Sequence, residues 1–256
     1  MAAEVVLEVR GARVAFGGVH AVDGVDLSVR DGEVVGIIGP NGAGKTTLLD
    51  AISGFVPLDA GAVVIGGRDA SRALPYLRAR MGVARSFQDA RMFPNMTVRE
   101  TLLGGMHQWF AAGFVSHGVG ISVARDEERL ADAALDDLLD LIDVRRFLDM
   151  RIADLSIGTV RAVELAWIAT RRPRLVLLDE PASGLQQSEV EVLGALIHRI
   201  RRNAATVVID HDVPFVVGIA DRMVAMGLGR VIADGAPEDV LAHPDVIASY
   251  LGSGTR

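Results

Sequence analysis

The sequence predicts an α/β protein whose central sheet contains buried parallel strands. Three short, almost wholly apolar runs carry this prediction: residues 34–38, 175–178 and 206–209. Runs of this kind are typical of strands that are buried on both faces. Each run is followed directly by glycines or by charged residues, and α/β proteins bind their ligands at the carboxyl ends of parallel strands. We therefore expect a ligand site where these three strands end.

The composition fits one large α/β domain, with or without a subdomain. The chain has 256 residues, of which 50% are hydrophobic, and this is enough for a sizeable core. It has no cysteine, which excludes disulfides and thiolate metal sites. The net charge of −7 argues against a surface that coats nucleic acid. The first residues, MAAEVVLEVRG, lack the basic region of a signal peptide, so we expect none.

The N-terminal segment predicts antiparallel β-structure. Residues 7–10 and 25–30 alternate between apolar and polar side chains. Asp31-Gly32 then predicts a hairpin turn into the apolar run 34–38. Phe16 lies upstream of that run and has two interpretations: it is an ordinary core residue, or it stacks on a nucleotide base.

A glycine-rich loop follows the first apolar run. Residues 39–46, GPNGAGKT, match G-x-x-x-x-G-K-[ST] at every required position. Leu48, Leu49 and Ile52 then mark one face of a helix, and Gly54 stands where a C-cap belongs. A chance lysine in a glycine-rich turn is the alternative. The strand before the loop and the helix after it favour a nucleotide site instead.

The loop predicts how a triphosphate is held. Backbone N–H groups and the helix N-terminus present unpaired donors to the phosphates. Lys45 reaches the β- and γ-phosphates, and Thr46 offers its hydroxyl to Mg²⁺. The predicted nucleotide-binding residues of this stretch are Gly39, Pro40, Asn41, Gly42, Ala43, Gly44, Lys45, Thr46 and Thr47.

The middle of the chain predicts a helical insert. A hairpin edge at 62–67 and a short strand that ends near Gln88 come first, and residues 97–144 then have a helical pattern. The insert begins with a capping box, Thr97 to Glu100. Residues 101–124 carry no formal charge, but glycines and polar side chains are spread along them, so we predict no membrane span. We expect 102–124 on the surface of the insert, where it serves docking or regulation.

The second and third apolar runs are each followed by groups suited to phosphate chemistry. Asp179 and Glu180 follow the second run, where Asp179 can hold Mg²⁺ and Glu180 can polarise a water molecule. His211 follows the third run and is placed to contact a γ-phosphate, although a lone histidine is usually structural. Ser156 and Gly158 begin another helix, whose N-terminus can bind an anion.

These motifs resemble those of ABC-type ATPase subunits, and the resemblance covers nearly the whole chain. The matching segments are GPNGAGKTT (Walker A), LVLLDEP (Walker B), LSIGT (signature), Gln88 (Q-loop), His211 (switch histidine) and Phe16 (base-stacking aromatic). Residues 82–105, the insert that follows and the ending 234–252 are most similar to the ATPases of branched-chain (hydrophobic) amino acid importers.

The resemblance implies a P-loop NTPase fold with a mixed, mainly parallel sheet core, an N-terminal antiparallel β part and a helical subdomain. A single domain, 1–256, would contain a core of 1–88 and 160–256 and a helical part of 89–159. The implied ligands are ATP and Mg²⁺. Glu180, His211 and Lys45 would be catalytic, and the metal would be held by Thr46, Gln88 and Asp179.

The resemblance also implies an assembly. Two such domains would pack head to tail, and each ATP would lie between one phosphate loop and the Ser156–Gly158 segment of the other domain. The second domain would be an identical copy or a sister ATPase. Transmembrane permease subunits and an extracytoplasmic substrate-binding protein would complete a transporter, with this chain at the cytoplasmic face of the cell membrane.

Two positions depart from the usual family pattern, and three other functions compete. Thr159 stands where Gln is usual, and Gln186 stands where Asp or Asn is usual, which puts communication between the two sites in doubt. A lipid or lipopolysaccharide transporter is the nearest alternative. A soluble ABC ATPase acting on nucleic acid or ribosomes typically carries tandem cassettes or long coiled coils. A P-loop kinase or GTPase would leave LSIGT and His211 unexplained.

Overall fold

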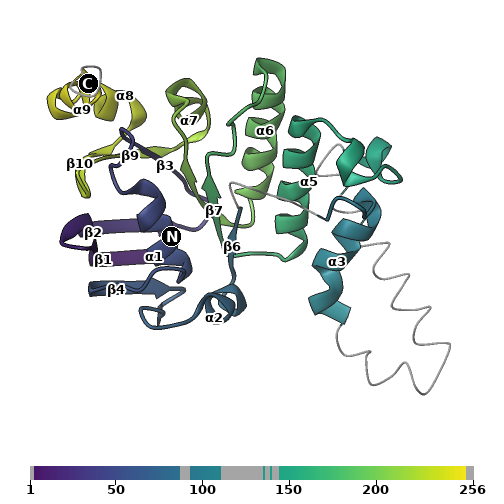
Figure 1. The fold of residues 1–256 in the computed structure, drawn as a ribbon, viewed down its shortest axis with the longest axis horizontal. Coiled ribbons are helices and arrows are strands. Elements are labelled where there is room, and N and C mark those ends of the chain that lie inside the picture. Colours follow the sequence, from purple (N-terminus) through teal and green to yellow (C-terminus); the bar gives the residue numbers. More distant parts are fainter. Residues whose placement is uncertain (1–2, 87–92, 111–134, 136–138, 140–143, 252–256) are drawn as a thin grey trace. The chain divides into compact units, whose positions relative to one another are not determined.

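The computed structural model describes residues 3–86, 93–110, 135, 139 and 144–251, without the side chains of 107–110 and 251 (Figure 1). The chain forms two compact units. The first consists of Met1–Gln88, Pro173–Ser183 and Ile200–Arg256, and the second of Asp89–Arg172 and Gly184–Arg199. Within the described ranges, no helix is long and apolar enough to cross a membrane.

The first unit contains an antiparallel sheet of order β2-β1-β4-β5, as the sequence predicts for its N-terminal part. Its strands are β1 (Val5–Phe16), β2 (Val19–Arg30), β4 (Ala60–Ile65) and β5 (Arg68–Asp69). The predicted hairpin at Asp31-Gly32 is wrong. A turn forms there, closed by the Glu33 N–H donating to Arg30 O at 3.0 Å. The next strand, residues 34–38, belongs instead to the other sheet, where it pairs in parallel with a neighbouring strand on each side.

The second sheet of this unit has the order β10-β9-β3-β8-β7-β6. It is mixed, as predicted, because β10 is antiparallel to β9 whereas the other neighbouring strands are parallel. Its strands are β3 (Val34–Ile38), β6 (Val83–Arg85), β7 (Leu175–Asp179), β8 (Ala205–Ile209), β9 (Arg222–Gly227) and β10 (Arg230–Gly235). Every residue of β3, β7 and β8 is buried.

The register of the parallel strands determines where the site lies. Ile209 of β8 pairs with Asp179 of β7 on one side and with Ile37 of β3 on the other. The segments that follow β3, β7 and β8 therefore leave the sheet at the same edge. This is the arrangement in which a single ligand can contact all three.

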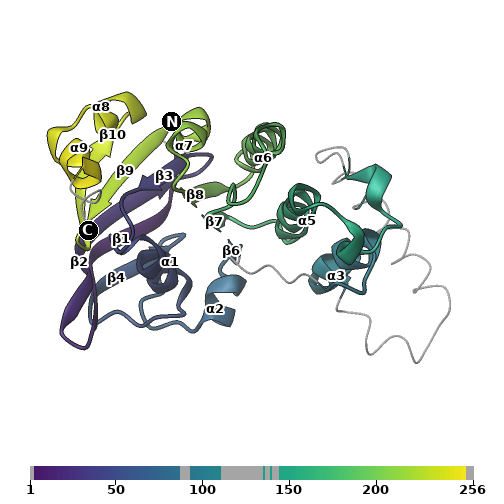
Figure 2. The ribbon, with the colours of Figure 1, turned by 45° about the horizontal axis from the view of Figure 1, so that its top comes forward.

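The helices of the first unit are α1 (Lys45–Ser53), α2 (Pro75–Arg80), α7 (Val213–Ile219), α8 (Pro237–Leu241) and α9 (Pro244–Leu251). Leu48, Leu49 and Ile52 of α1 are buried in a core that includes residues of both sheets. This core holds the helix rigidly behind the loop that precedes it. Helices α8 and α9 pack beside β9 and β10 (Figures 1 and 2).

The second unit is helical in its described part. It contains α3 (Val98–Phe110), the 3₁₀ turns η3 (Arg145–Phe147) and η4 (Ile152–Asp154), α5 (Ile157–Thr170) and most of α6 (Gln187–Ile200). The predicted capping box is present, because the Thr97 N–H donates to Glu100 Oε2 at 2.8 Å and the Glu100 N–H donates to Thr97 Oγ1 at 3.2 Å.

The expected surface position of 102–124 is wrong for its first residues. Leu102 and Met106 are buried, and α3 packs against α5. A Cβ atom placed on Gly105 would lie 2.4 Å from the hydroxyl of Thr170, so the two helices approach closely at this glycine. In 102–106 the uncharged side chains therefore serve helix packing. Residues 111–124 lie outside the described residues.

Candidate active site

The loop after β3 adopts a conformation that depends on glycine. Gly39, Gly42 and Gly44 have φ angles of 152°, 79° and 94°. A Cβ atom on Gly39 would lie 2.3 Å from Met226 O, and one on Gly44 would lie 2.0 Å from Ala21 O. Side chains at these two positions would push the loop off the strands that support it.

The start of α1 is open to an anion. Gly44 is its N-cap, so no side chain caps it within the described structure, and no acidic residue stands in its first turn. Asn41 and Thr46 are exposed and Thr47 is half-buried, whereas Ala43 is buried beneath the loop. The free N–H groups and the positive end of the helix dipole favour a bound phosphate here.

Lys45 is folded into the loop. Its Nζ donates to Gly39 O at 2.6 Å and to Pro40 O at 3.1 Å, and the side chain is buried. Burial lowers the pKa of Lys45, while the negative charges of Glu180 and Asp179 act to raise it. The ammonium group therefore closes the loop from within, and it feels the charge of the two carboxylates that the sequence assigns to the site.

Asp179 ends β7 as a buried carboxylate with one free oxygen. The residue is 2% exposed, and its Oδ2 accepts a hydrogen bond from Arg85 at 3.1 Å. Its Oδ1 has no hydrogen-bond partner among the described residues. Burial raises the pKa of Asp179, and Arg85 opposes this shift.

The unpartnered oxygen fits a hydrated Mg²⁺. A buried acceptor without a donor is costly unless a ligand satisfies it. The part of the chain that the structure describes contains no cluster of three metal-ligating side chains. A Mg²⁺ ion at Asp179 would thus take most of its ligands from phosphate oxygens, water and the Thr46 hydroxyl, as Mg²⁺ commonly does in phosphate sites.

Glu180 follows in a strained conformation. Its φ angle is 48°, in the left-handed region that non-glycine residues rarely adopt. The Glu180 N–H donates to Ile209 O at 2.7 Å, and its carbonyl accepts from the Ser183 N–H at 3.2 Å. Such strain persists only where its surroundings enforce it, and it is common at active sites. Here it turns the chain sharply at the carboxyl edge of the sheet.

His211 stands beside a buried carboxylate. Asp210 Oδ2 accepts from the Ala182 N–H at 2.9 Å, and its Oδ1 accepts from the Asp212 N–H at 3.0 Å. The His211 Nδ1 lies 3.7 Å from Asp210 Oδ1, and the His211 side chain is 63% exposed. The imidazole is therefore accessible to a ligand, while Asp210 holds the backbone of the next residue, Asp212.

Phe16 is the last residue of β1 and is 54% exposed. Its interpretation as an ordinary core residue is wrong. An exposed aromatic ring at a strand end remains compatible with base stacking. Gln88, the other residue predicted to border this site, lies outside the described residues.

In the second unit, Ser156 is the N-cap of α5. Its Oγ accepts from the Thr159 N–H at 3.2 Å and lies 3.4 Å from Glu189 Oε1. A Cβ atom on Gly158 would lie 2.3 Å from the same carboxylate oxygen. A carboxylate thus occupies the space at this helix N-terminus, as the dipole favours.

The two unusual residues belong to the same group of contacts. The hydroxyl of Thr159 lies 3.0 Å from Ser156 Oγ. The Gln186 N–H donates to Glu189 Oε2 at 3.0 Å. Thr159 thus contacts Ser156 through its side chain, whereas Gln186 contacts Glu189 through its backbone N–H, which does not depend on the side chain at position 186.

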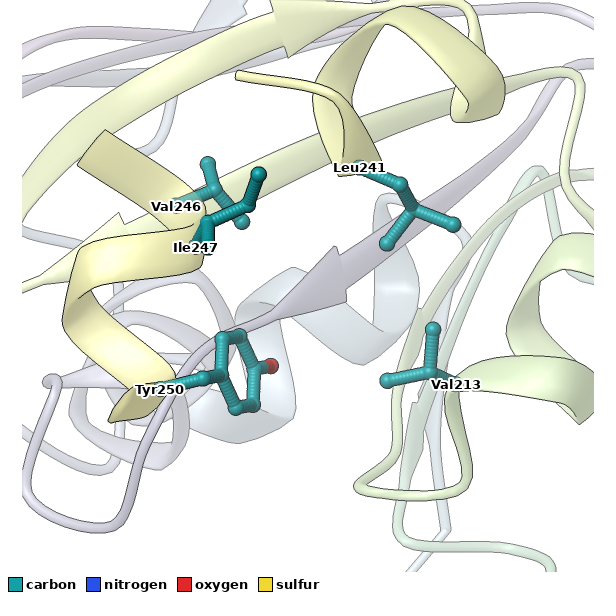
Figure 3. A pocket seen from close by; sticks show the side chains of 5 residues that line it. All are labelled: Val213, Leu241, Val246, Ile247 and Tyr250. Atoms are coloured by element: carbon teal, nitrogen blue, oxygen red, sulfur yellow. The ribbon is translucent and has the colours of Figure 1, made fainter. Parts of the chain in front are cut away.

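Sequence reasoning missed three residues of the first unit: Arg85, Asp210 and Tyr250. An arginine inside a short apolar strand was the available signal for Arg85. Tyr250 had none. It lies on α9 and lines a pocket of about 280 Å³ whose other lining residues are Val213, Leu241, Val246 and Ile247 (Figure 3). Burial raises the pKa of Tyr250, and a hydrogen bond with the backbone of Gly39 opposes the shift. The C-terminal helix therefore contacts the phosphate loop.

Comparison with known proteins agrees with this geometry. Residues 22–183 match the family model described as "ABC transporter". Residues 230–255 match the one described as "Branched-chain amino acid ATP-binding cassette transporter".

Curated relatives and solved structures give the same result. The high-affinity branched-chain amino acid transport ATP-binding protein BraF of Pseudomonas aeruginosa is 37% identical over 96% of this chain and 98% of its own length. LivG of Escherichia coli K12, which carries the same description, is 36% identical over 96% of this chain and 97% of its own length. The crystal structure of the ADP conformation of MJ1267, an ATP-binding cassette of an ABC transporter, has a TM-score of 0.82 at 27% identity and covers 97% of this chain and 99% of MJ1267. This chain belongs to the ABC transporter family, as one of its ATP-hydrolysing subunits.

Proposed function

We propose that this chain powers the import of branched-chain amino acids. The observation that carries the substrate class is the match of residues 230–255 to the branched-chain family model, on a chain that aligns with BraF over nearly its whole length. A lipid or lipopolysaccharide transporter, the alternative raised by the sequence, has no comparable support.

The site residues divide the chemistry between them. The backbone N–H groups of the loop and the ammonium of Lys45 bind the phosphates. Thr46 and Asp179, with Gln88 by resemblance, hold Mg²⁺, which when bound neutralises charge on the β- and γ-phosphates. Glu180 orients and polarises the attacking water, and His211 donates to the γ-phosphate as charge develops there. Phe16 stacks on the base.

The second unit supplies a site for a neighbouring subunit. Each ATP is sandwiched between one phosphate loop and the Ser156–Gly158 segment of a second ATPase, either an identical copy or a sister chain. The carboxylate of Glu189, 3.4 Å from Ser156 Oγ, supports this proposal because it shows a negative group accommodated at that helix N-terminus. Glu189 must turn aside when the phosphate arrives.

The proposed partners are transmembrane permease subunits and an extracytoplasmic binding protein, with this chain at the cytoplasmic face of the membrane. The permease docks beside the strand that leads to Gln88. Phe55 supports this placement, because its ring is exposed and the guanidinium of Arg85, the last residue of β6, lies 5.7 Å from its centroid. Leu74 and Tyr76, at the start of α2, add exposed apolar surface in the same unit.

Reconstitution tests the proposal. We expect this subunit to co-purify with permease subunits that, in proteoliposomes loaded with ATP and supplied with the binding protein, take up labelled leucine, isoleucine or valine. The same complex with Lys45→Ala is the control and should take up none. ATPase stimulation by lipid or lipopolysaccharide, without stimulation by these amino acids, would contradict the proposal.

A further inference from the structure

Arg85 joins three elements of the first unit that carry the nucleotide chemistry. It ends β6, and one of its terminal nitrogens donates to Asp50 Oδ1 at 2.6 Å and to Ser53 Oγ at 2.9 Å, both on α1. The other terminal nitrogen donates to Asp179 Oδ2 at 3.1 Å, at the end of β7. The guanidinium thus connects the helix that begins with Lys45 and Thr46 to the strand that ends in Asp179.

This connection determines which oxygen of Asp179 is available. Oδ2 is engaged by Arg85, and the backbone N–H of Asp179 donates to Ser86 Oγ at 3.1 Å. Oδ1 is buried and has no partner within the described structure. Rotation of the carboxylate would break the contact with Arg85, so both the backbone and the side chain of Asp179 are held in one orientation.

We propose that Arg85 is a positioning residue for the metal: it holds Oδ2 of Asp179 and thereby presents Oδ1 to the hydrated Mg²⁺ of the ATP complex. This inference rests on the metal site proposed above. Partners that orient a metal ligand commonly contribute 10- to 100-fold to metal affinity. The fork of the guanidinium can bridge Asp50 and Asp179 at the same time, which the single ammonium of a lysine cannot do equally well.

Arg78 provides a matched control. It is also a buried arginine of the first unit, at 2% exposure, and it also contacts α1. Within the described ranges its hydrogen-bond partners are all backbone carbonyls, those of Ala51, Ile52, Ser71 and Ala73. Arg78 therefore braces the end of α1 without touching a carboxylate of the site.

The experiment measures binding of Mn²⁺, a paramagnetic substitute for Mg²⁺, to the ATP complex by electron paramagnetic resonance. ATP affinity in EDTA and thermal unfolding are measured alongside. We expect Arg85→Met to weaken Mn²⁺ binding about 10- to 100-fold and to leave ATP affinity in EDTA within about twofold. Arg85→Lys should show a smaller loss of the same kind. Arg78→Met should lower the unfolding temperature and leave Mn²⁺ affinity unchanged.

A variant of the half-exposed Asp50 provides a second test in case Arg85→Met does not fold. Asp50→Asn removes the negative charge that holds the guanidinium on α1, and we expect it and Arg85→Lys each to weaken Mn²⁺ binding several-fold. Mn²⁺ affinity in both variants equal to or above that of the wild type would overturn the role of Arg85. Wild-type protein that binds ATP but shows no Mn²⁺ site would instead overturn the metal site itself.

Discussion

The buried carboxylate of Asp210 accepts a 2.9 Å hydrogen bond from the backbone N–H of Ala182. These residues follow two neighbouring strands, β8 and β7, and each stands next to a proposed catalytic group. Ala182 is two residues beyond Glu180, and Asp210 directly precedes His211. The bond therefore ties the turn that carries the water-activating acid to the turn that carries the switch histidine.

Asp210→Ala should break this tie. The Ala182 N–H would lose its acceptor, and an unsatisfied buried donor costs about 1–3 kcal/mol of unfolding free energy. We expect that loss in urea unfolding, together with a fall in ATP turnover and little change in ATP affinity. The control is Asp212→Ala, which removes the N-cap of α7, a hydrogen bond from the Phe215 N–H at 3.1 Å. It should cost about 1 kcal/mol and largely preserve turnover, so an equal loss of turnover in both variants contradicts the prediction.

Lys45→Ala should abolish nucleotide binding and turnover while the domain still folds. Among the described residues, the ammonium donates only to the carbonyls of Gly39 and Pro40, so its loss removes ligand binding more than core packing. A hydrogen bond to a charged group contributes about 1.5–3 kcal/mol, and loss of contacts to two phosphates should weaken ATP binding by about 10²-fold or more. Calorimetric titration with ATP and circular dichroism measure the two properties. Unchanged ATP affinity would refute the assignment of the loop.

Glu180→Gln should separate binding from hydrolysis. Glutamine has nearly the same size, and at a φ angle of 48° it meets the same strain as glutamate, so the fold should be retained. Loss of the carboxylate should reduce turnover by about 10²–10⁴-fold. ATP should remain bound, and size exclusion should show a dimer with ATP and mostly monomer with ADP.

The natural pair can be a heterodimer, so the sister ATPase is included in a second run of the same experiment. Turnover at the wild-type rate would exclude Glu180 as the catalytic acid. Lost turnover without any ATP-dependent dimer, alone or with the sister chain, would remove the proposed role of Ser156 and Gly158.

Two glycines of the loop provide a test of its geometry. Gly42 and Gly44 both have positive φ, but a Cβ atom on Gly42 meets nothing within 4 Å, whereas one on Gly44 would lie 2.0 Å from Ala21 O. Gly42→Ala should therefore cost only the left-handed strain, about 1–2 kcal/mol. Gly44→Ala should cost more, because it displaces the loop from β2, and should also weaken ATP binding. Urea unfolding and ATP titration compare the two variants, and equal effects would contradict the structure of the loop.

The strands that carry the site could be predicted because strands buried on both faces need apolar side chains at nearly every position. Apart from Thr206 and Asp179, β3, β7 and β8 consist of apolar residues and glycine, and the loop motif indicates a bound nucleotide. It was harder to predict from the sequence which of the two sheets each strand joins. The turn at Asp31-Gly32 has the composition of a hairpin, yet the strand after it joins the other sheet, where it pairs in parallel with β8 and β9.

Residues that act through distant partners were not predictable. Arg85 meets Asp50 and Asp179, which are 35 and 94 positions away in the sequence, and no local pattern reports such a contact. The burial of Leu102 and Met106 was missed for a related reason. An uncharged helix can pack against another protein or against other helices of its own chain. Only the packing of α3 on α5 distinguishes these two possibilities.

The contact between Tyr250 and Gly39 has a practical consequence for anyone producing this subunit. An affinity tag fused directly after α9, the helix that carries Tyr250, would begin beside a helix that contacts the phosphate loop. A tag placed directly before β1 is separated from Gly39 in the sequence by the strands β1, β2 and β3. Nucleotide affinities measured on the two kinds of tagged protein should be compared before either is taken as native.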